Sequence, residues 1–187
     1  MNLIILGAPG SGKGTQAEKI AKEFNLAHIS GGESLRKEIA SGSRKGELIA
    51  HIMEKGDLVP FETISSVIEP EILENKDNFI LDGSPRDLVQ AEYLNAFFAE
   101  NKINIDFVIY LHVPDEKLID RLLLRAKTEN RVDDNLESIQ ERFKVFHQNT
   151  EPVIAFYQKN SHFLKIDGDR SIEDIAKELS NIIGQST

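Results

Sequence analysis

The first fifteen residues constrain the fold of this chain more than any other stretch. An apolar run, Leu3–Leu6, leads into the letters GAPGSGKGT, in which Gly7 to Lys13 spell the pattern G-x-x-x-x-G-K. A strand, a glycine-rich turn and an amphipathic helix in this order form a loop whose backbone N–H groups surround a phosphate. The helix N-terminus adds partial positive charge, and Lys13 supplies a mobile cation for the terminal phosphates. The stretch therefore predicts a nucleoside triphosphate site, because an ordinary glycine-rich turn would not require the whole motif in this context.

Size, charge and residue usage narrow the classes of protein that this chain can be. Its 187 residues suffice for one domain with a substantial core, and 22 basic against 31 acidic residues give a formal net charge of −9. We therefore expect no broad basic face for nucleic acid, and expect local Arg and Lys clusters to hold any anionic ligand. The absence of cysteine excludes disulfides, thiol catalysis and Cys-ligated zinc. The apolar run LIILG is too short for a membrane span or a signal sequence, so we expect a cytoplasmic protein that contacts no membrane.

Short apolar runs alternate with longer helical patterns along the chain. Buried strands are predicted at Leu3–Leu6, Phe79–Leu81, Phe107–Leu111 and His162–Ile166, with a weaker one at Ala27–Ser30. The helix after the loop has a buried face of Ala17, Ile20, Ala21 and Phe24, and further helices are predicted at Glu33–Ala40, Glu47–Lys55, Thr63–Leu73, Leu88–Glu100, Glu116–Arg125, Leu136–Gln158 and Ile172–Ile183. This alternation predicts an α/β fold with a central five-stranded parallel sheet, covered by helices, and with ligands at the carboxyl ends of the strands.

Two segments interrupt this alternation. Gly31–Pro60 inserts helices without an obvious strand, and the polar stretch AKTENRVDDN separates two predicted helices. We interpret both as candidates for lobes that move over a ligand.

A second cluster of polar residues follows the strand predicted at Phe79–Leu81. In FILDGSPRD, Asp82 and Arg86 come directly after this strand, so they lie at the same edge of the sheet as the phosphate loop. An aspartate there can hold Mg²⁺ through its water shell, and an arginine can bind a phosphate with two hydrogen bonds. Arg36 offers a further cation on the first inserted segment.

Four more arginines lie close together in the stretch RLLLRAKTENRVDDNLESIQERF. They are Arg121, Arg125, Arg131 and Arg142, and Asp133 and Asp134 lie among them. A lone arginine on a helix is usually a solvated residue. Four in one short stretch of an acidic protein with a phosphate loop favour a clamp on phosphates instead.

With these pieces in place, the chain resembles the short-lid type of the adenylate kinase family. The resemblance covers nearly the whole chain, through GAPGSGKGTQ, HISGGESLR, GDLVP, LDGSPRDLVQA, RVDDNLESIQERF and TEPVIAFY. It implies a single P-loop kinase domain with a core of residues 1–29, 60–123 and 135–187, a helical flap over the nucleoside monophosphate at 30–59, and a short lid at 124–134. It also implies transfer of a phosphoryl group from MgATP to AMP, giving two ADP in a reversible reaction that maintains adenine nucleotide balance.

The same resemblance assigns residues to the two nucleotides. The ATP site would comprise Gly10, Ser11, Gly12, Lys13, Gly14, Thr15, Arg121 and Arg125, with the backbone of Arg170 at the adenine. The AMP site would comprise Gly31, Arg36, Asp57, Leu58, Val59, Gly83, Ser84, Pro85, Arg86, Gln90, Arg131 and Arg142. Arg36 and Arg86 would hold the AMP phosphate, and Gln90 would recognise the adenine. The catalytic set would be Lys13, Arg86, Arg125, Arg131 and Arg142, which align the phosphates and neutralise their charge without a covalent intermediate.

The residue after Lys13 departs from the general phosphate-loop motif. A Ser or Thr usually follows this lysine and ligates Mg²⁺, but here Gly14 follows and Thr15 comes one place later. The resemblance accounts for this, because adenylate kinases also use Gly followed by Thr. Mg²⁺ would then be held by substrate phosphates and water and oriented by Asp82, and no zinc site is expected.

Three residues depart from the usual pattern of the family. Gly31 stands where the family usually has Thr, Glu33 where it has Asp, and Ser84 where it has Phe or Tyr. Gly31 and Ser84 remove side-chain atoms near the acceptor pocket, so we expect a less strict preference for AMP.

Two other functions remain open at this point. The nearer alternative is a UMP/CMP kinase of the same fold, but that group tends to have Asn directly after the phosphate-binding Arg and differs at the position of Gln90. The more distant alternative is a GTP-binding switch, which should contain the guanine motif N-K-x-D; the nearest strings, NKDN and NKIN, do not match.

We expect a monomer whose partners are ATP and AMP.

Overall fold

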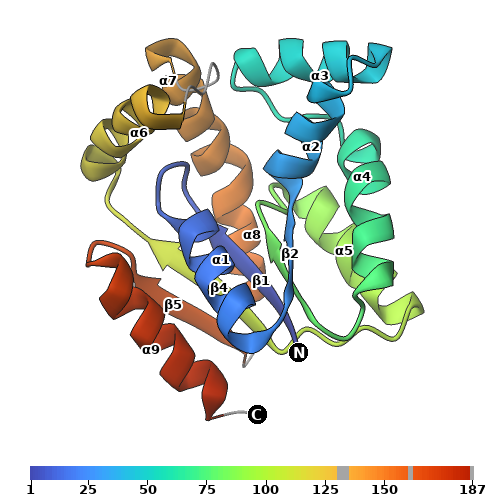
Figure 1. The fold of residues 1–187 in the computed structure, drawn as a ribbon, viewed down its shortest axis with the longest axis vertical. Coiled ribbons are helices and arrows are strands. Elements are labelled where there is room, and N and C mark those ends of the chain that lie inside the picture. Colours follow the sequence, from blue (N-terminus) through green and yellow to red (C-terminus); the bar gives the residue numbers. More distant parts are fainter. Residues whose placement is uncertain (130–134, 160–161, 186–187) are drawn as a thin grey trace.

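A computed structural model of the protein describes residues 1–129, 135–159 and 162–185. Within these residues, five strands form one parallel sheet in the order β2-β3-β1-β4-β5 (Figure 1). The strands are β1 (Asn2–Gly7), β2 (Ala27–Ser30), β3 (Phe79–Asp82), β4 (Phe107–His112) and β5 (Phe163–Asp167). The predicted fold class and all five predicted strands are confirmed, with ends that differ by at most one residue.

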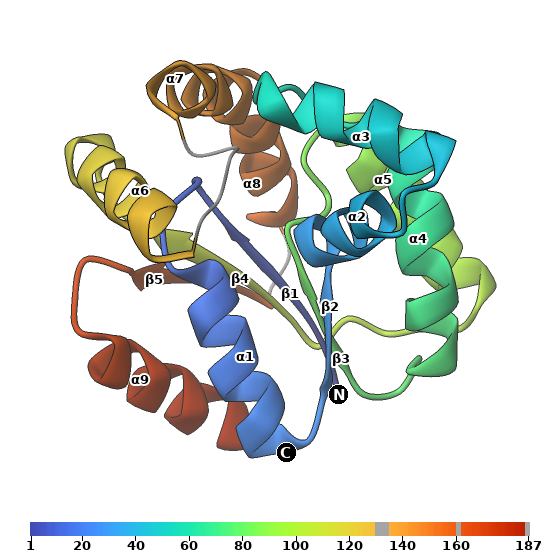
Figure 2. The same cartoon turned by 45° about the horizontal axis from the view of Figure 1, so that its top comes forward.

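Helices cover both faces of the sheet, and each face has its own hydrophobic core. Leu3 and Ile5 of β1 pack with α1 (Lys13–Phe24) and α9 (Ile172–Gly184), whereas Ile4 and Leu6 point to the opposite core. That second core contains residues of α4 (Phe61–Glu74), α5 (Leu88–Glu100), α6 (Asp115–Glu129), α7 (Leu136–Val145) and α8 (Glu151–Tyr157). Figure 2 shows α1 and α9 together on one side of the sheet, with α4, α5 and α8 on the other. Alternating side chains of a strand buried on both faces explain why β1 is a continuous apolar run.

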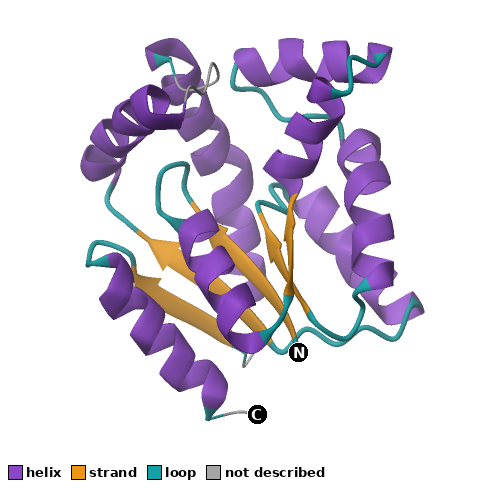
Figure 3. Cartoon of the chain, in the orientation of Figure 1, coloured by secondary structure: helices purple, strands orange, loops and turns teal. Residues whose placement is uncertain are grey.

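The insertion predicted after β2 contains helices and no strand among the described residues. α2 (Gly31–Ala40) and α3 (Arg44–Glu54) extend beyond the carboxyl ends of the strands, and α4 returns the chain to the sheet (Figure 3). Ser30 caps α2 by accepting a hydrogen bond from the backbone N–H of Glu33, and Ser43 caps α3 in the same way at Gly46. Two caps and a short connection fold residues 30–59 into a helical pair at one end of the sheet.

Two predicted helix boundaries differ from the structure. α6 was expected to end at Arg125 but continues to Glu129, because the following residues AKTE contain neither Gly nor Pro and favour a helix. Residues 124–129 of the predicted lid are therefore helical. Residues 130–134 lie outside the described residues.

The single helix predicted at Leu136–Gln158 is interrupted. One turn of π-helix, Phe146–Thr150, which we call the π-turn, separates α7 from α8. The N–H of Glu151 donates to the carbonyl of Phe146, five residues back. Pro152 has no N–H to give to the carbonyl four residues before it, which favours a wider turn here. Throughout the described part of the chain, every helix is too short or too polar to cross a bilayer.

Candidate active site

The phosphate loop lies where the sequence places it, between the carboxyl end of β1 and the first residue of α1. Gly10 and Gly12 have φ angles of +81° and +90°, a region that side chains disfavour. A Cβ atom on Gly10 would also lie 2.9 Å from Cγ of Leu122 in α6. These glycines therefore allow both the curvature of the loop and its close contact with α6.

One cleft of about 690 Å³ brings together most of the predicted phosphate-binding residues. The predicted residues that line it are Gly10, Gly12, Lys13, Gly14, Thr15, Arg36, Asp82, Gly83, Arg86, Arg121, Arg125 and Arg142. Its volume is within the range of ligand sites. Segments distant in sequence, namely the phosphate loop, the flap, the end of β3 and the helices α6 and α7, thus meet around one space.

Lys13 lies at the centre of the positive charge in this cleft. Burial lowers the pKa of its ammonium group to about 8; Asp82 opposes this shift, and the charges of Arg86, Arg142 and Arg125 add to it. The three arginines are thus close enough to act on the lysine electrostatically. Such a concentration of cations in an acidic protein favours an anionic ligand, and several phosphates match it.

Asp82 is the buried acidic residue of the cleft, whereas Glu18 and Glu33 line it as exposed residues. Burial favours its neutral form, but His28, Lys13 and Arg86 hold the pKa of this carboxyl below its usual value. His28 Nε2 lies 3.6 Å from Asp82 Oδ2, while Oδ1 is buried without a hydrogen-bond partner among the described residues. An ionised, incompletely satisfied carboxylate beside phosphate-binding groups fits a role in orienting the water shell of Mg²⁺.

The packing around Gly14 gives a steric reason for the missing Ser or Thr. A Cβ atom on Gly14 would lie 3.3 Å from Oδ2 of Asp82, which is tighter than ordinary contact. A hydroxyl-bearing side chain at this position would press on the carboxylate. Asp82 would have to shift by a few tenths of an ångström to accommodate such a side chain, so Gly14 allows the carboxylate to pack closely against the loop.

Within the residues that the structure describes, no group of three or more His, Cys, Asp or Glu side chains could hold a metal ion.

A second, narrower pocket adjoins the cleft at the flap. It is lined by the predicted acceptor residues Gly31, Asp57, Leu58, Val59, Gly83, Ser84, Arg86 and Gln90, together with Gly32, Leu35, Met53 and Ile64. Pro85 lines a neighbouring hollow with Lys13, Arg86 and Arg142. Arg86 therefore lies at the junction between the phosphate cleft and a largely apolar pocket of the kind that accepts a base.

Two departures from the family pattern have limited effects on the size of this pocket. A Cβ atom on Gly31 would lie 3.2 Å from Cδ1 of Ile64, so this isoleucine occupies part of the space that a larger residue would use. Ser84 is 1% exposed and lies inside the protein rather than at the mouth of the pocket.

Gln90 is buried in this pocket, and its carboxamide is held by the preceding loop. Its Oε1 accepts a hydrogen bond from the backbone N–H of Arg86 at 2.9 Å, and its Nε2 donates to Oδ2 of Asp87 at 3.0 Å. Arg86 is fixed in turn, because its Nε donates to the carbonyl of Gly83 and its own carbonyl accepts from Thr150 Oγ1, both at 2.8 Å. Thr150 belongs to the π-turn, so the unpredicted break between α7 and α8 supports the Arg86 loop.

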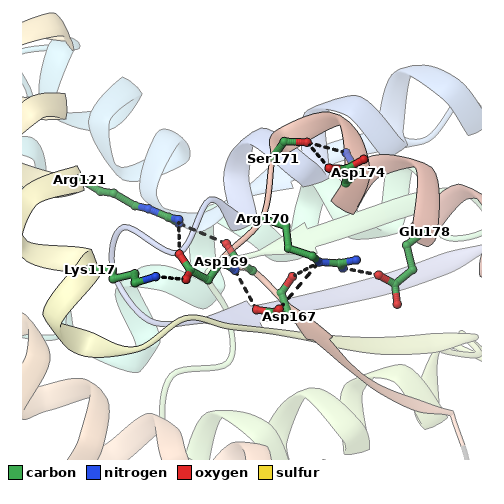
Figure 4. Close-up of polar contacts among 9 residues, drawn as sticks. Lys117, Arg121, Asp167, Asp169, Arg170, Ser171, Asp174 and Glu178 are labelled. Carbon is green, nitrogen blue, oxygen red and sulfur yellow. Dashed lines mark hydrogen bonds and ion pairs between the residues drawn. The ribbon is translucent and has the colours of Figure 1, made fainter.

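Arg121, which lines the cleft, and Arg170, which does not, belong to one polar network around Asp167 and Asp169 (Figure 4). Arg121 donates to the carbonyl of Gly168 at 3.3 Å and to Oδ1 of Asp169 at 3.2 Å, and Lys117 also binds Asp169. The guanidinium of Arg170 binds Glu178 and the carbonyl of Asp167, and it lines neither of the two described pockets. The prediction that Arg121 binds ATP stays a prediction, although its guanidinium already has partners within the protein.

Other predicted residues and some unpredicted ones complete the site. Ser11 is buried within the loop, and Arg131 lies outside the described residues. Sequence reasoning missed His28 and Asp169, and it used Asp87 only to distinguish AMP kinases from UMP/CMP kinases, without giving its side chain a role. A signal for Asp87 was present, since D-x-x-Q before an apolar run is typical of a helix start.

Comparisons with known proteins agree with this arrangement. A family model described as Adenylate kinase matches residues 5–162. The chain is 38% identical to the adenylate kinase of Petrotoga mobilis, over 98% of this chain and 97% of that protein. It is also 38% identical to the adenylate kinase of Xanthomonas campestris, over 99% of this chain and all of the other, and 37% identical to adenylate kinase isoenzyme 1 of Sus scrofa, over 95% and 91%. Each match therefore includes both the phosphate cleft and the pocket beside it.

Proposed function

This chain belongs to the adenylate kinase family and has adenylate kinase activity, and from that premise we propose how its residues divide the transfer of a phosphoryl group from MgATP to AMP. The observation that carries the proposal is the position of Arg86. This residue lines the cleft that contains Lys13 and also the pocket that contains Gln90. A direct transfer requires the phosphates of two nucleotides to meet at one place, and Arg86 marks that place.

The donor side binds the phosphates of MgATP. The backbone of Gly10–Thr15 surrounds them, and Lys13 with Arg125 neutralises the group in transfer. Arg121 is assigned to the same nucleotide at the far end of the cleft, and the backbone around Arg170 to its adenine.

The acceptor side binds AMP. Arg36 and Arg86 hold its phosphate, Asp57–Val59 and Gly31 enclose the base, and Gln90 recognises the adenine. Arg142 and Arg131 bridge the phosphates of the two nucleotides. Closure of the flap at 30–59 and of the lid at 124–134 excludes water, so that the phosphoryl group passes to AMP and not to water.

Mg²⁺ enters as part of the substrate. Bound to the phosphates, it adds positive charge where negative charge develops, and the ionised Asp82 orients it through water. The remaining assignments are that the enzyme is a cytoplasmic monomer, with no nucleic acid or membrane partner, that maintains adenine nucleotide balance.

One ligand tests the two-site arrangement directly. Two adenosines joined by five phosphates fill both sites at once, so we expect one molecule per chain, affinity higher than that of either nucleotide, and exclusion of both ATP and AMP in calorimetric titrations. A compound that displaced ATP but left AMP binding intact would contradict a shared phosphate junction.

A further inference from the structure

At the N-terminus of α5, the side chain of Asp87 accepts two hydrogen bonds from Gln90, one more than capping the helix requires. Asp87 is the N-cap residue, with an extended backbone. Its Oδ1 accepts the backbone N–H of Gln90 at 2.8 Å, as an N-cap should, while its Oδ2 accepts a second hydrogen bond from the side-chain Nε2 of the same glutamine at 3.0 Å. Capping needs only the first of these contacts.

The two contacts of the Gln90 carboxamide determine which way it faces. The backbone N–H of Arg86 can only donate, so it requires Oε1, and the carboxylate of Asp87 can only accept, so it requires Nε2. Reversing the amide would break both hydrogen bonds and would place donor against donor and acceptor against acceptor. Gln90 is only 3% exposed, so water cannot compensate for either loss.

We propose that Asp87 is a specificity-determining residue, which fixes the orientation of the Gln90 amide and thereby makes the acceptor pocket select a 6-aminopurine over a 6-oxopurine. This inference rests on the proposed contact between Gln90 and the acceptor base. After its two internal hydrogen bonds, the carboxamide has one N–H and one oxygen lone pair left. Adenine offers the matching pair, an acceptor at ring N1 beside a donor at the 6-amino group.

Hypoxanthine and guanine present the opposite pair on the same edge, a donor at N1 beside an acceptor at O6. A freely rotating amide could bind either edge by turning over. An amide held by Asp87 and the Arg86 backbone can bind only the first, so a 6-oxopurine would leave two buried polar pairs mismatched. Arg86 contributes through its backbone, which substitution cannot change, whereas the contribution of Asp87 can be altered.

Two substitutions at this position separate orientation from capping. Asp87→Asn keeps a cap and an acceptor for the Gln90 backbone, but it replaces Oδ2 with an NH₂ group that conflicts with Nε2. Asp87→Ser also caps the helix, but it puts no second donor beside the amide. In the Asn variant, each orientation of the Gln90 amide has one donor facing a donor, either at residue 87 or at the Arg86 N–H, so the reversed amide becomes competitive with the original one. In the Ser variant the Arg86 N–H still favours the original orientation.

The test is kcat/KM with saturating MgATP for AMP and for inosine monophosphate, which differ at this edge alone. We expect Asp87→Asn to lower the AMP-to-IMP ratio roughly tenfold and Asp87→Ser to lower it no more than about threefold, with the KM for ATP unchanged in both. Gln90→Ala should reduce the ratio further and should abolish any effect of adding Asp87→Asn.

Four results would overturn the proposal, and the last of them would also overturn the proposed acceptor assignment. Equal ratios in Asp87→Asn and wild type, or equal losses in Asp87→Asn and Asp87→Ser, would show that Asp87 acts only as a cap. A further drop on adding Asp87→Asn to Gln90→Ala would show that it acts without the glutamine. If Gln90→Ala itself left the ratio unchanged, Gln90 would not read the base, and the proposed acceptor assignment would fail with the inference.

Discussion

The phosphate loop and the acceptor base pocket lie at the same edge of one sheet, but they are built from different materials. The loop is mainly backbone, with two glycines at positive φ and the N-terminus of α1. The base pocket depends on side chains, in particular the buried amide of Gln90 and the residues that hold it. Phosphate binding therefore requires only a few residue types, whereas base selection depends on the identity and orientation of individual side chains.

The same difference explains where this chain departs from its family pattern. Gly14 fits the family on the donor side and has a packing reason, the carboxylate of Asp82. On the acceptor side, Gly31 and Ser84 differ from the usual residues, and Ile64 fills part of the space left at Gly31. We therefore expect the reaction to be unchanged and the choice of acceptor to be less strict.

The largest expected effect is on the donor side. Lys13→Met should leave the fold intact and lower kcat by about 10²- to 10³-fold, because a cation on the transferring phosphate acts mainly in the transition state. Steady-state rates together with a circular dichroism melt measure both parts. A folded variant within tenfold of wild-type kcat would remove Lys13 from the mechanism.

The next effect should separate the two nucleotides. Arg36→Ala should weaken AMP by about 10- to 100-fold, because it removes charge-assisted hydrogen bonds to the AMP phosphate, while ATP binding stays within about twofold. Arg86→Ala should show the same bias. Calorimetric titrations with each nucleotide alone measure this, and equal weakening of both would contradict the assignment of these arginines to the acceptor side.

A smaller effect is expected at the base itself. Gln90→Ala should narrow the preference for AMP over CMP and UMP by about three- to tenfold, because the purine loses hydrogen bonds that a pyrimidine makes less well. The ranking of kcat/KM across the three acceptors measures it. An unchanged ranking would mean that Gln90 only stabilises the loop before α5.

The smallest expected effect is the uptake of a proton by Lys13 when ATP binds on the donor side. Since the pKa of Lys13 is lowered to about 8, most free enzyme carries a neutral lysine at pH 8.5, and a bound polyphosphate should restore its charge. MgATP binding should then take up a large fraction of one proton at pH 8.5 and almost none at pH 6.5. Calorimetry in two buffers of different ionisation enthalpy gives this number, with Lys13→Met as the control. Equal uptake in the control would assign the proton to another group.

The sequence predicts features that depend on local patterns better than it predicts contacts between side chains from distant segments. The strands and the phosphate loop could be predicted, because short apolar runs and the spacing of Gly7 to Lys13 are local signals. The role of the π-turn could not be predicted, because it depends on a hydrogen bond from Thr150 to the carbonyl of Arg86, which is far away in the sequence. The partners of Arg121 at Gly168 and Asp169 also come from a segment far along the chain.

The most direct test of the whole account is a comparison of acceptors in the unmodified enzyme. Initial rates of ADP formation from saturating MgATP with AMP, CMP, UMP or GMP give kcat/KM for each. The account predicts the highest value for AMP, with low but measurable values for CMP and UMP. A kcat/KM for CMP or UMP that equalled or exceeded that for AMP would contradict it.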